Sequence, residues 1–128
     1  MPAESVVFLT FDEALAMHER LIEHFGGSPG VRDPGLLESA LYRPQTGYYR
    51  DLAEMATALL ESLLMNHPFV DGNKRMAFFG TDVFLRLNGW RFHVDPEPTH
   101  DFLVGRLESG DCDLEHLLPW VRDSVRRL

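Results

Sequence analysis

The chain has 128 residues, which suits one domain with a single buried core, and we treat residues 1–128 as that domain. Its formal net charge of −8 disfavours duplex nucleic acid as a direct partner, because neutralising phosphates requires a basic face. The single cysteine excludes an internal disulfide, and the sequence lacks both a signal-peptide pattern and a membrane-spanning apolar run, so we expect a cytoplasmic protein with no membrane partner.

Helix-capping patterns mark the first two predicted helices. Thr10 and Glu13 have the spacing of a capping box, which predicts a helix over residues 11–25. Asp33 followed by proline predicts the start of a second helix that runs to about residue 42. His18, on the first helix, is expected to be a core or boundary histidine rather than a ligand.

The middle of the chain contains the most apolar predicted helix. Residues 43–50 are expected to form a loop or a small hairpin with exposed aromatics, and Asp51 then caps a helix that Pro68 ends. A wide apolar face predicts that this helix is central in the fold. That face is formed by Leu52, Met55, Ala56, Leu59, Leu60, Leu63 and Leu64.

The second half of the chain is predicted to contain three further helices. They are expected over residues 73–88, from Thr99 to about 109, and from Asp113 to about 128, with a short strand near residues 90–95. The fold class is therefore mainly α: a compact bundle of about six helices with at most a small β-hairpin.

The stretch HPFVDGNKR, residues 67–75, gathers reactive side chains between two apolar segments, and it includes Lys74, the only lysine. Lys74 and Arg75 fall at the start of a predicted helix, where cations are unfavourable unless an anion neutralises them. Free amides at such an end bind anions, and Gly72 allows close backbone approach, so the pattern predicts a phosphate chain as ligand. Asp71 could then hold Mg²⁺, and His67 could act as a general base.

A structural interpretation of the same stretch also stands. Asp71-Gly72 is a common turn, His67 could cap a helix, and Phe69 could simply fill the core. Lys74 and Arg75 would then lie on a solvated face.

Beyond this chemistry, residues 67–75 resemble the Fic/Doc motif, HPFx[D/E]GN[G/K]RxxR, at His67, Pro68, Phe69, Asp71, Gly72, Asn73 and Arg75. Residues 25–45 and 84–92 are similar to the flanking blocks of its Doc, or death-on-curing, branch. Two positions depart from the general Fic pattern, since Lys74 replaces a glycine and Phe78 replaces a second arginine. Both departures are features of the Doc branch, whose members transfer the γ-phosphate of ATP rather than AMP.

The resemblance implies a Fic/Doc-like fold and a toxin kinase that uses ATP and Mg²⁺ to phosphorylate a threonine or serine of elongation factor Tu, which arrests translation. By position, His67 would be the base and Asp71 the Mg²⁺ ligand, while Phe69 would anchor the loop. The phosphates would be held by Gly72, Asn73, Lys74 and Arg75. Thr46, Gly47 and Tyr48 would belong to a β-hairpin flap that binds the target.

The sequence has no match to the inhibitory motif [S/T]xxxE[G/N] of many Fic proteins, and its nearest segment, TALLES at residues 57–62, falls inside the predicted central helix. Inhibition is therefore expected from a separate chain, and the resemblance to the Doc branch implies a small Phd-like antitoxin whose disordered C-terminal segment folds on the toxin. Two alternatives remain open: a Fic-type adenylyltransferase that transfers AMP to a protein hydroxyl, and a catalytically inert helical binding module.

Overall fold

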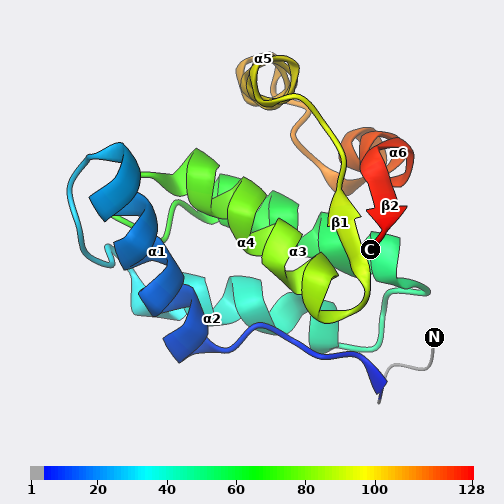
Figure 1. Ribbon diagram of the computed structural model, residues 1–128, viewed down its shortest axis with the longest axis horizontal. Coiled ribbons are helices and arrows are strands. Elements are labelled where there is room, and N and C mark those ends of the chain that lie inside the picture. The colour runs from blue at the N-terminus through cyan, green and yellow to red at the C-terminus, as the bar shows by residue number, and fades with distance from the viewer. Residues whose placement is uncertain (1–4) are drawn as a thin grey trace.

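The computed structural model describes residues 5–128, and within them six α-helices are accompanied by a two-stranded antiparallel sheet (Figure 1). This confirms the predicted mainly-α class. The elements are α1 (Phe11–Phe25), α2 (Pro34–Tyr42), the 3₁₀ helix η2 (Arg43–Gln45), α3 (Leu52–Asn66), α4 (Asn73–Leu87), β1 (Trp90–Phe92), α5 (Pro96–Ser109), α6 (Leu114–Ser124) and β2 (Val125–Arg127). No helix among residues 5–128 combines the length and hydropathy needed to cross a bilayer.

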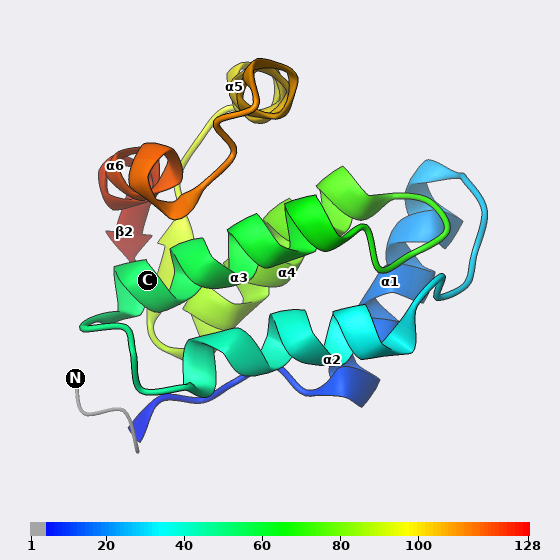
Figure 2. The ribbon, with the colours of Figure 1, turned by 180° about the vertical axis from the view of Figure 1, so that it is seen from behind.

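Helix α3 is the centre of the fold, as its apolar face predicts. It packs against α2, α4 and α6, and Figures 1 and 2 show α3 and α4 running side by side through the middle of the molecule. Leu59, Leu60 and Leu63 are at most 1% exposed. The two helices on either side of the loop at residues 67–72 therefore pack directly against each other.

Side-chain caps begin most of these helices where the sequence predicts them. Thr10 and Glu13 form the expected capping box at α1. Asp33, Asp51 and Asp113 each accept a backbone N–H at the start of α2, α3 and α6. Because capping is a local interaction, these starts are readable from sequence.

Helix α5 begins earlier than predicted. It starts at Pro96 after Asp95, whereas Thr99 was expected to be the cap. Thr99 is instead inside the first turn, where its hydroxyl donates to the Asp95 carbonyl at 2.8 Å. Figures 1 and 2 show α5 standing apart from the α3–α4 layer, beyond α6.

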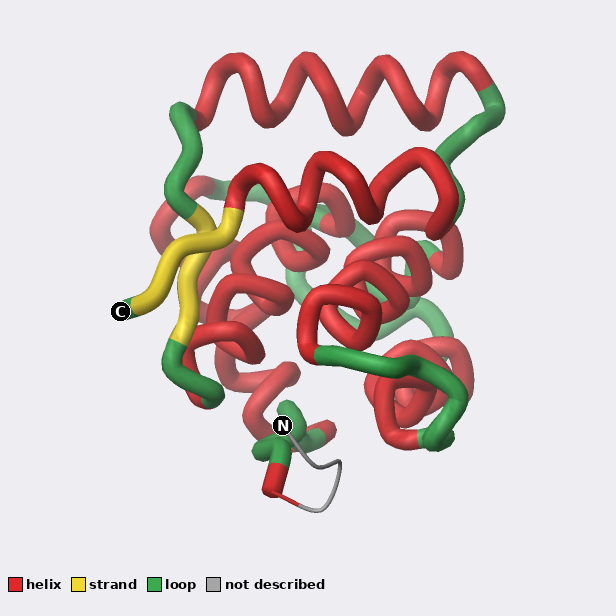
Figure 3. The backbone as a smooth tube through the Cα atoms, turned by 90° about the vertical axis from the view of Figure 1, so that its right-hand side faces the viewer, coloured by secondary structure: helices red, strands yellow, loops and turns green. Residues whose placement is uncertain are grey.

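The C-terminal end also differs from the prediction, because α6 stops at Ser124. Val125–Arg127 then forms β2, which pairs antiparallel with β1 at Trp90–Phe92 (Figure 3). Asp82 fixes β1 by accepting the Phe92 N–H at 2.8 Å. This sheet is the small β element of the fold, while residues 43–50 form η2 and a loop rather than a hairpin.

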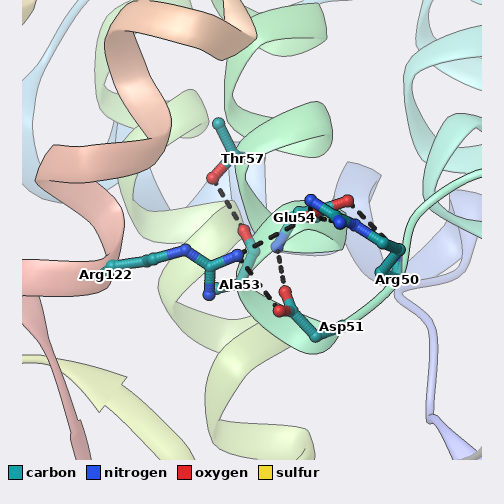
Figure 4. Close-up of polar contacts among 6 residues, drawn as sticks. All are labelled: Arg50, Asp51, Ala53, Glu54, Thr57 and Arg122. Atoms are coloured by element: carbon teal, nitrogen blue, oxygen red, sulfur yellow. Dashed lines mark hydrogen bonds and ion pairs between the residues drawn. The ribbon is translucent and has the colours of Figure 1, made fainter.

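An ion-pair network joins α6 to the N-terminal end of α3 (Figure 4). Arg122 donates to Asp51 at 3.0 Å and lies 3.6 Å from Glu54. Arg50 donates to Glu54 at 3.1 Å through its backbone N–H and again through Nε. Burial acts to raise the pKa of Asp51, but the Glu54 N–H and the Arg122 guanidinium outweigh it and lower that pKa.

Candidate functional site

The loop between α3 and α4 presents His67 in an unusual backbone conformation. His67 is the C-cap of α3 and has φ 47° and ψ 56°, in the left-handed region. It is the only non-glycine residue with positive φ among residues 5–128. A non-glycine residue held there stores strain, which accumulates at functional sites.

The Asp71 carboxylate is exposed but firmly oriented. Its Oδ2 accepts the Ser28 N–H at 3.0 Å, and its Oδ1 accepts the Gly72 N–H at 2.8 Å. These two bonds, the first from Ser28 and the second from Gly72, lower the pKa of Asp71. The group is therefore ionised at neutral pH with its direction fixed.

His18 and Phe69 support this loop from the core side. The two rings stack with centroids 3.9 Å apart, and both residues are at most 2% exposed. His18 Nε2 donates to the Asp71 carbonyl at 2.8 Å. The expectation that His18 is a core histidine is confirmed, and its contact with Asp71 adds a supporting role that the sequence did not reveal.

Asn73 shapes the turn with its side chain. Its Oδ1 accepts the Phe69 N–H and its Nδ2 donates to the Phe69 carbonyl, both at 3.0 Å. The side-chain amide of Asn73 is thus engaged within the loop, while its backbone N–H lies in the first turn of α4.

The N-terminal end of α4 is suited to an anion. Gly72 is the N-cap with φ 73°, and no side chain of residues 5–128 caps this helix, in contrast to α1, α2, α3 and α6. The first intrahelical bond runs from Met76 N to Gly72 O, which leaves the amides of residues 73–75 without an intrahelical acceptor. These N–H groups and the helix dipole favour negative charge.

Lys74 and Arg75 add two cations at the same end. Within residues 5–128, neither forms an ion pair with a carboxylate. Arg75 instead lies over the Phe25 ring, with Cζ 4.3 Å from its centroid. Both side chains therefore remain available to a bound anion.

Two hollows meet at this loop, and His67 and Lys74 line both. The larger hollow, of about 610 Å³, is also lined by residues 71–75, and part of its wall is aromatic, formed by Phe25, Phe78 and Phe79. The smaller, of about 440 Å³, is bounded by Met65, Val104, Leu107, Glu108, Gly110 and Cys112. His67 thus stands at the boundary of two spaces large enough for different reactants.

The structure brings together His67, Phe69, Asp71, Gly72, Asn73, Lys74 and Arg75, but not the candidate flap. Thr46, Gly47 and Tyr48 precede α3, whereas His67 follows it. A helix of 15 residues spans about 22 Å, so these groups lie near opposite ends of α3. Tyr48 is 82% exposed there and packs edge-on against Tyr49.

Several residues of the site are missing from the sequence-based assignment. Ser28 and Arg32, from the loop between α1 and α2, bond to the 66–72 segment, and Phe25 and Phe79 form part of the hollow's wall. Contacts between residues more than 30 positions apart have no signal in a single sequence.

The donor set fits Mg²⁺ that arrives with a polyphosphate. Among residues 5–128, no three His, Cys, Asp or Glu side chains gather closely enough to hold a metal by themselves. Mg²⁺ is commonly held by one or two carboxylates together with substrate phosphates and waters. Asp71, oriented by two backbone N–H groups next to the start of α4, is a carboxylate of the kind that could take this part.

Comparison with known proteins places this loop in a family. The sequence model of the Fic/DOC family matches residues 8–85, more than half of the chain. "Toxin Doc" of Mycolicibacterium smegmatis is 42% identical over 99 residues, which cover 73% of this chain and 76% of that protein. "Protein kinase doc" of Escherichia phage P1 is 34% identical over 121 residues, which cover 91% of each.

Proposed function

The chain belongs to the Fic/DOC family, and we propose that it is a Doc-type toxin that transfers the γ-phosphate of ATP to a threonine or serine hydroxyl of a protein. One observation carries the chemistry: Lys74 and Arg75, which have no carboxylate partner among residues 5–128, stand at the uncapped start of α4 and line the same hollow as His67 and Asp71. This arrangement supplies a phosphate clamp, a base and a metal ligand, which suffice for phosphoryl transfer.

In the proposed reaction, the nucleotide occupies the larger hollow and the acceptor hydroxyl approaches His67 from the smaller one. The hydroxyl oxygen bonds to the γ-phosphorus as the bond to the β,γ-bridging oxygen breaks, and ADP leaves. His67 takes the hydroxyl proton. Asp71 would hold Mg²⁺, which would supply positive charge to neutralise the phosphates.

The remaining residues of the loop have distinct proposed roles. Lys74 and Arg75, with the amides of residues 73–75, hold the phosphates, and Gly72 lets the backbone come close to them. Asn73 maintains the turn through its two bonds to Phe69, and Phe69 anchors the loop in the core.

Phosphoryl transfer is favoured over AMP transfer by the two departures from the Fic pattern. Phe78 stands where a second phosphate-binding arginine would be, and its ring stacks on Phe92 with centroids 5.1 Å apart. An aromatic ring in the wall of the hollow offers no charge to hold the α-phosphate of a nucleotide in the AMP-transfer orientation.

The proposed target is elongation factor Tu, and the proposed inhibitor is a Phd-like antitoxin. Both follow from the resemblance to the Doc branch, and the relative named "Toxin Doc" supports a toxin role. Such an antitoxin would fold its C-terminal segment on binding.

The deciding experiment is mass spectrometry of purified elongation factor Tu after incubation with this protein and ATP–Mg²⁺, with His67→Ala as the control. A phosphoryl-sized adduct that requires His67 supports the proposal. An adenylyl-sized adduct would show a Fic-type adenylyltransferase instead. Should neither adduct form on this target, the same assay on whole lysate tests for another acceptor, and His67→Ala that stays fully toxic in cells would indicate the inert binding module.

A further inference from the structure

Arg32 holds the turn that carries His67. It lies in the loop between α1 and α2, 35 positions before His67 in the sequence. Its Nε donates to the His67 carbonyl and its Nη2 to the Asn66 carbonyl, both at 2.7 Å. The planar fork of the guanidinium thus binds two successive carbonyls at the end of α3.

The backbone of the same residue continues this contact. The N–H groups of Arg32 and Asp33 donate to the Pro68 carbonyl at 2.8 Å and 3.0 Å. Three consecutive carbonyls, at Asn66, His67 and Pro68, therefore accept from one short segment. An isolated antiparallel bridge between Val31 and Phe69 extends the pairing by one residue.

These bonds satisfy carbonyl groups at the C-terminal end of α3. The last carbonyls of a helix have no intrahelical donor, and glycine at the end usually supplies the left-handed residue that closes it. At this end, His67 adopts the left-handed conformation and Arg32 satisfies the carbonyls. A cation there also complements the helix dipole.

The Arg32 side chain is exposed, and among residues 5–128 it forms no ion pair with a carboxylate. Its polar contacts are directed at the backbone on either side of the His67 Cα. Because the backbone sets the direction of the Cα–Cβ bond and restricts the allowed rotamers, the contact limits where the His67 ring can point.

We infer that Arg32 is a positioning residue that keeps His67 in its left-handed conformation and so aims the base at the acceptor hydroxyl. The inference rests on the proposed phosphoryl transfer. It predicts that losing Arg32 slows the chemical step while leaving nucleotide binding intact, since Arg32 does not line the larger hollow.

The test compares Arg32→Ala and Arg32→Lys with Arg86→Ala, which removes an arginine that is bonded to Asp82 outside the site. A misplacement of about 1 Å can cost about 10²-fold in rate, so we expect kcat to fall at least ~10-fold in Arg32→Ala with KM for ATP within ~2-fold. Arg32→Lys should recover part of kcat, because an ammonium can still donate to one carbonyl. Arg86→Ala should retain the kcat of the unmodified protein.

A second measurement needs no activity. The backbone ¹³C and ¹⁵N shifts of His67, recorded without nucleotide, should move in Arg32→Ala and stay unchanged in Arg86→Ala. Unchanged His67 shifts, or a rise in KM alone, would overturn the inference. If the unmodified protein transfers no phosphate to any acceptor, the proposed function fails, and the shifts alone decide whether Arg32 fixes His67.

Discussion

The two ends of α3 carry charged residues in opposite arrangements. At the N-terminal end, Asp51 and Glu54 are matched by Arg50 and Arg122, so the charges neutralise one another (Figure 4). Beyond the C-terminal end, Lys74 and Arg75 have no carboxylate partner among residues 5–128, and Asp71 is held by backbone N–H groups.

This difference separates a structural cluster from a binding site. The paired charges neutralise one another within the protein and connect α6 to α3. They therefore offer no uncompensated charge to a ligand. Lys74 and Arg75 lie at the positive end of the α4 dipole, where cations destabilise the free protein. A bound phosphate would attract both the cations and the helix end, so the same arrangement would favour the complex. Local rules are broken where function requires it.

The largest expected effect comes from His67. Loss of a general base typically costs 10²–10⁴-fold, so both His67→Ala and His67→Gly should reduce transfer by at least about 10²-fold. Their stabilities should differ, because glycine adopts the left-handed conformation freely. We expect the free energy of unfolding, measured by urea denaturation, to be about 1 kcal/mol higher for His67→Gly than for His67→Ala. Equal stability of the two variants would show that the backbone at this position is not strained.

A second comparison sets Lys74→Ala against Arg122→Ala, one from each end of α3. Lys74→Ala should raise the free energy of unfolding by about 0.3–1 kcal/mol, because it removes a cation from a helix N-terminus. Its affinity for ATP–Mg²⁺ should fall about tenfold through the loss of a charged hydrogen bond.

Arg122→Ala should show the reverse behaviour. Because its ion pair with Asp51 is exposed, we expect the free energy of unfolding to fall by about 0.2–1 kcal/mol. The affinity for ATP–Mg²⁺ should stay unchanged. Thermal unfolding with and without ATP–Mg²⁺ measures both effects. A Lys74→Ala protein that is less stable and binds ATP normally would remove the distinction between the two ends.

The same contrast explains what could be read from the sequence. Caps such as Thr10 and Asp51 bond within three residues, so local patterns predicted those helix starts. The HPFVDGNKR stretch is contiguous, so its residues meet without help from the fold. Asp95-Pro96 has the same Asp-Pro pattern as Asp33-Pro34, and this pattern correctly predicts the start of α5 at Pro96.

What could not be read depends on tertiary contact. Strand β2 forms because residues 125–127 meet 90–92, whereas the local pattern continues the helix. The bonds of Ser28 to Asp71 and of Arg32 to His67 join segments that only the packed helices bring together. The sequence therefore identified the candidate reactive residues, but it did not predict the long-range contacts that hold them in place.

A smaller effect on phosphoryl transfer is expected from Gly27, where the chain passes Asp71. A Cβ at Gly27 would lie 2.7 Å from Asp71 Oδ2, whereas one at Gly26 would meet nothing within 4 Å. Both have positive φ, so each alanine variant should lose about 1–2 kcal/mol of stability. Only Gly27→Ala should displace the carboxylate and raise the Mg²⁺ concentration needed for half-maximal transfer. An equal Mg²⁺ requirement in the two variants would argue against Asp71 as the metal ligand.

The smallest effect concerns a second paired cluster, at the start of α6. The Asp113 carboxylate lies 2.6 Å from His116 Nδ1, and this bond raises the pKa of His116 above its ordinary value despite an opposing contribution from desolvation. Because the folded pKa is raised, the stabilisation is fully present below the unfolded pKa, about 6.5, and is lost as pH rises through the folded value.

Asp113→Asn tests whether this cluster is structural, since asparagine caps a helix about as well as aspartate. An NMR titration should show a lower His116 pKa in the variant, although Asp111, 3.8 Å away, remains to favour the imidazolium. The stability of the variant should depend less on pH, and its rate of phosphoryl transfer should match that of the unmodified protein. Gly110 and Cys112 of the adjoining loop line the smaller hollow, so a changed rate would mean that a paired cluster also serves the acceptor side. Pairing would then no longer separate the structural charges of this protein from the functional ones.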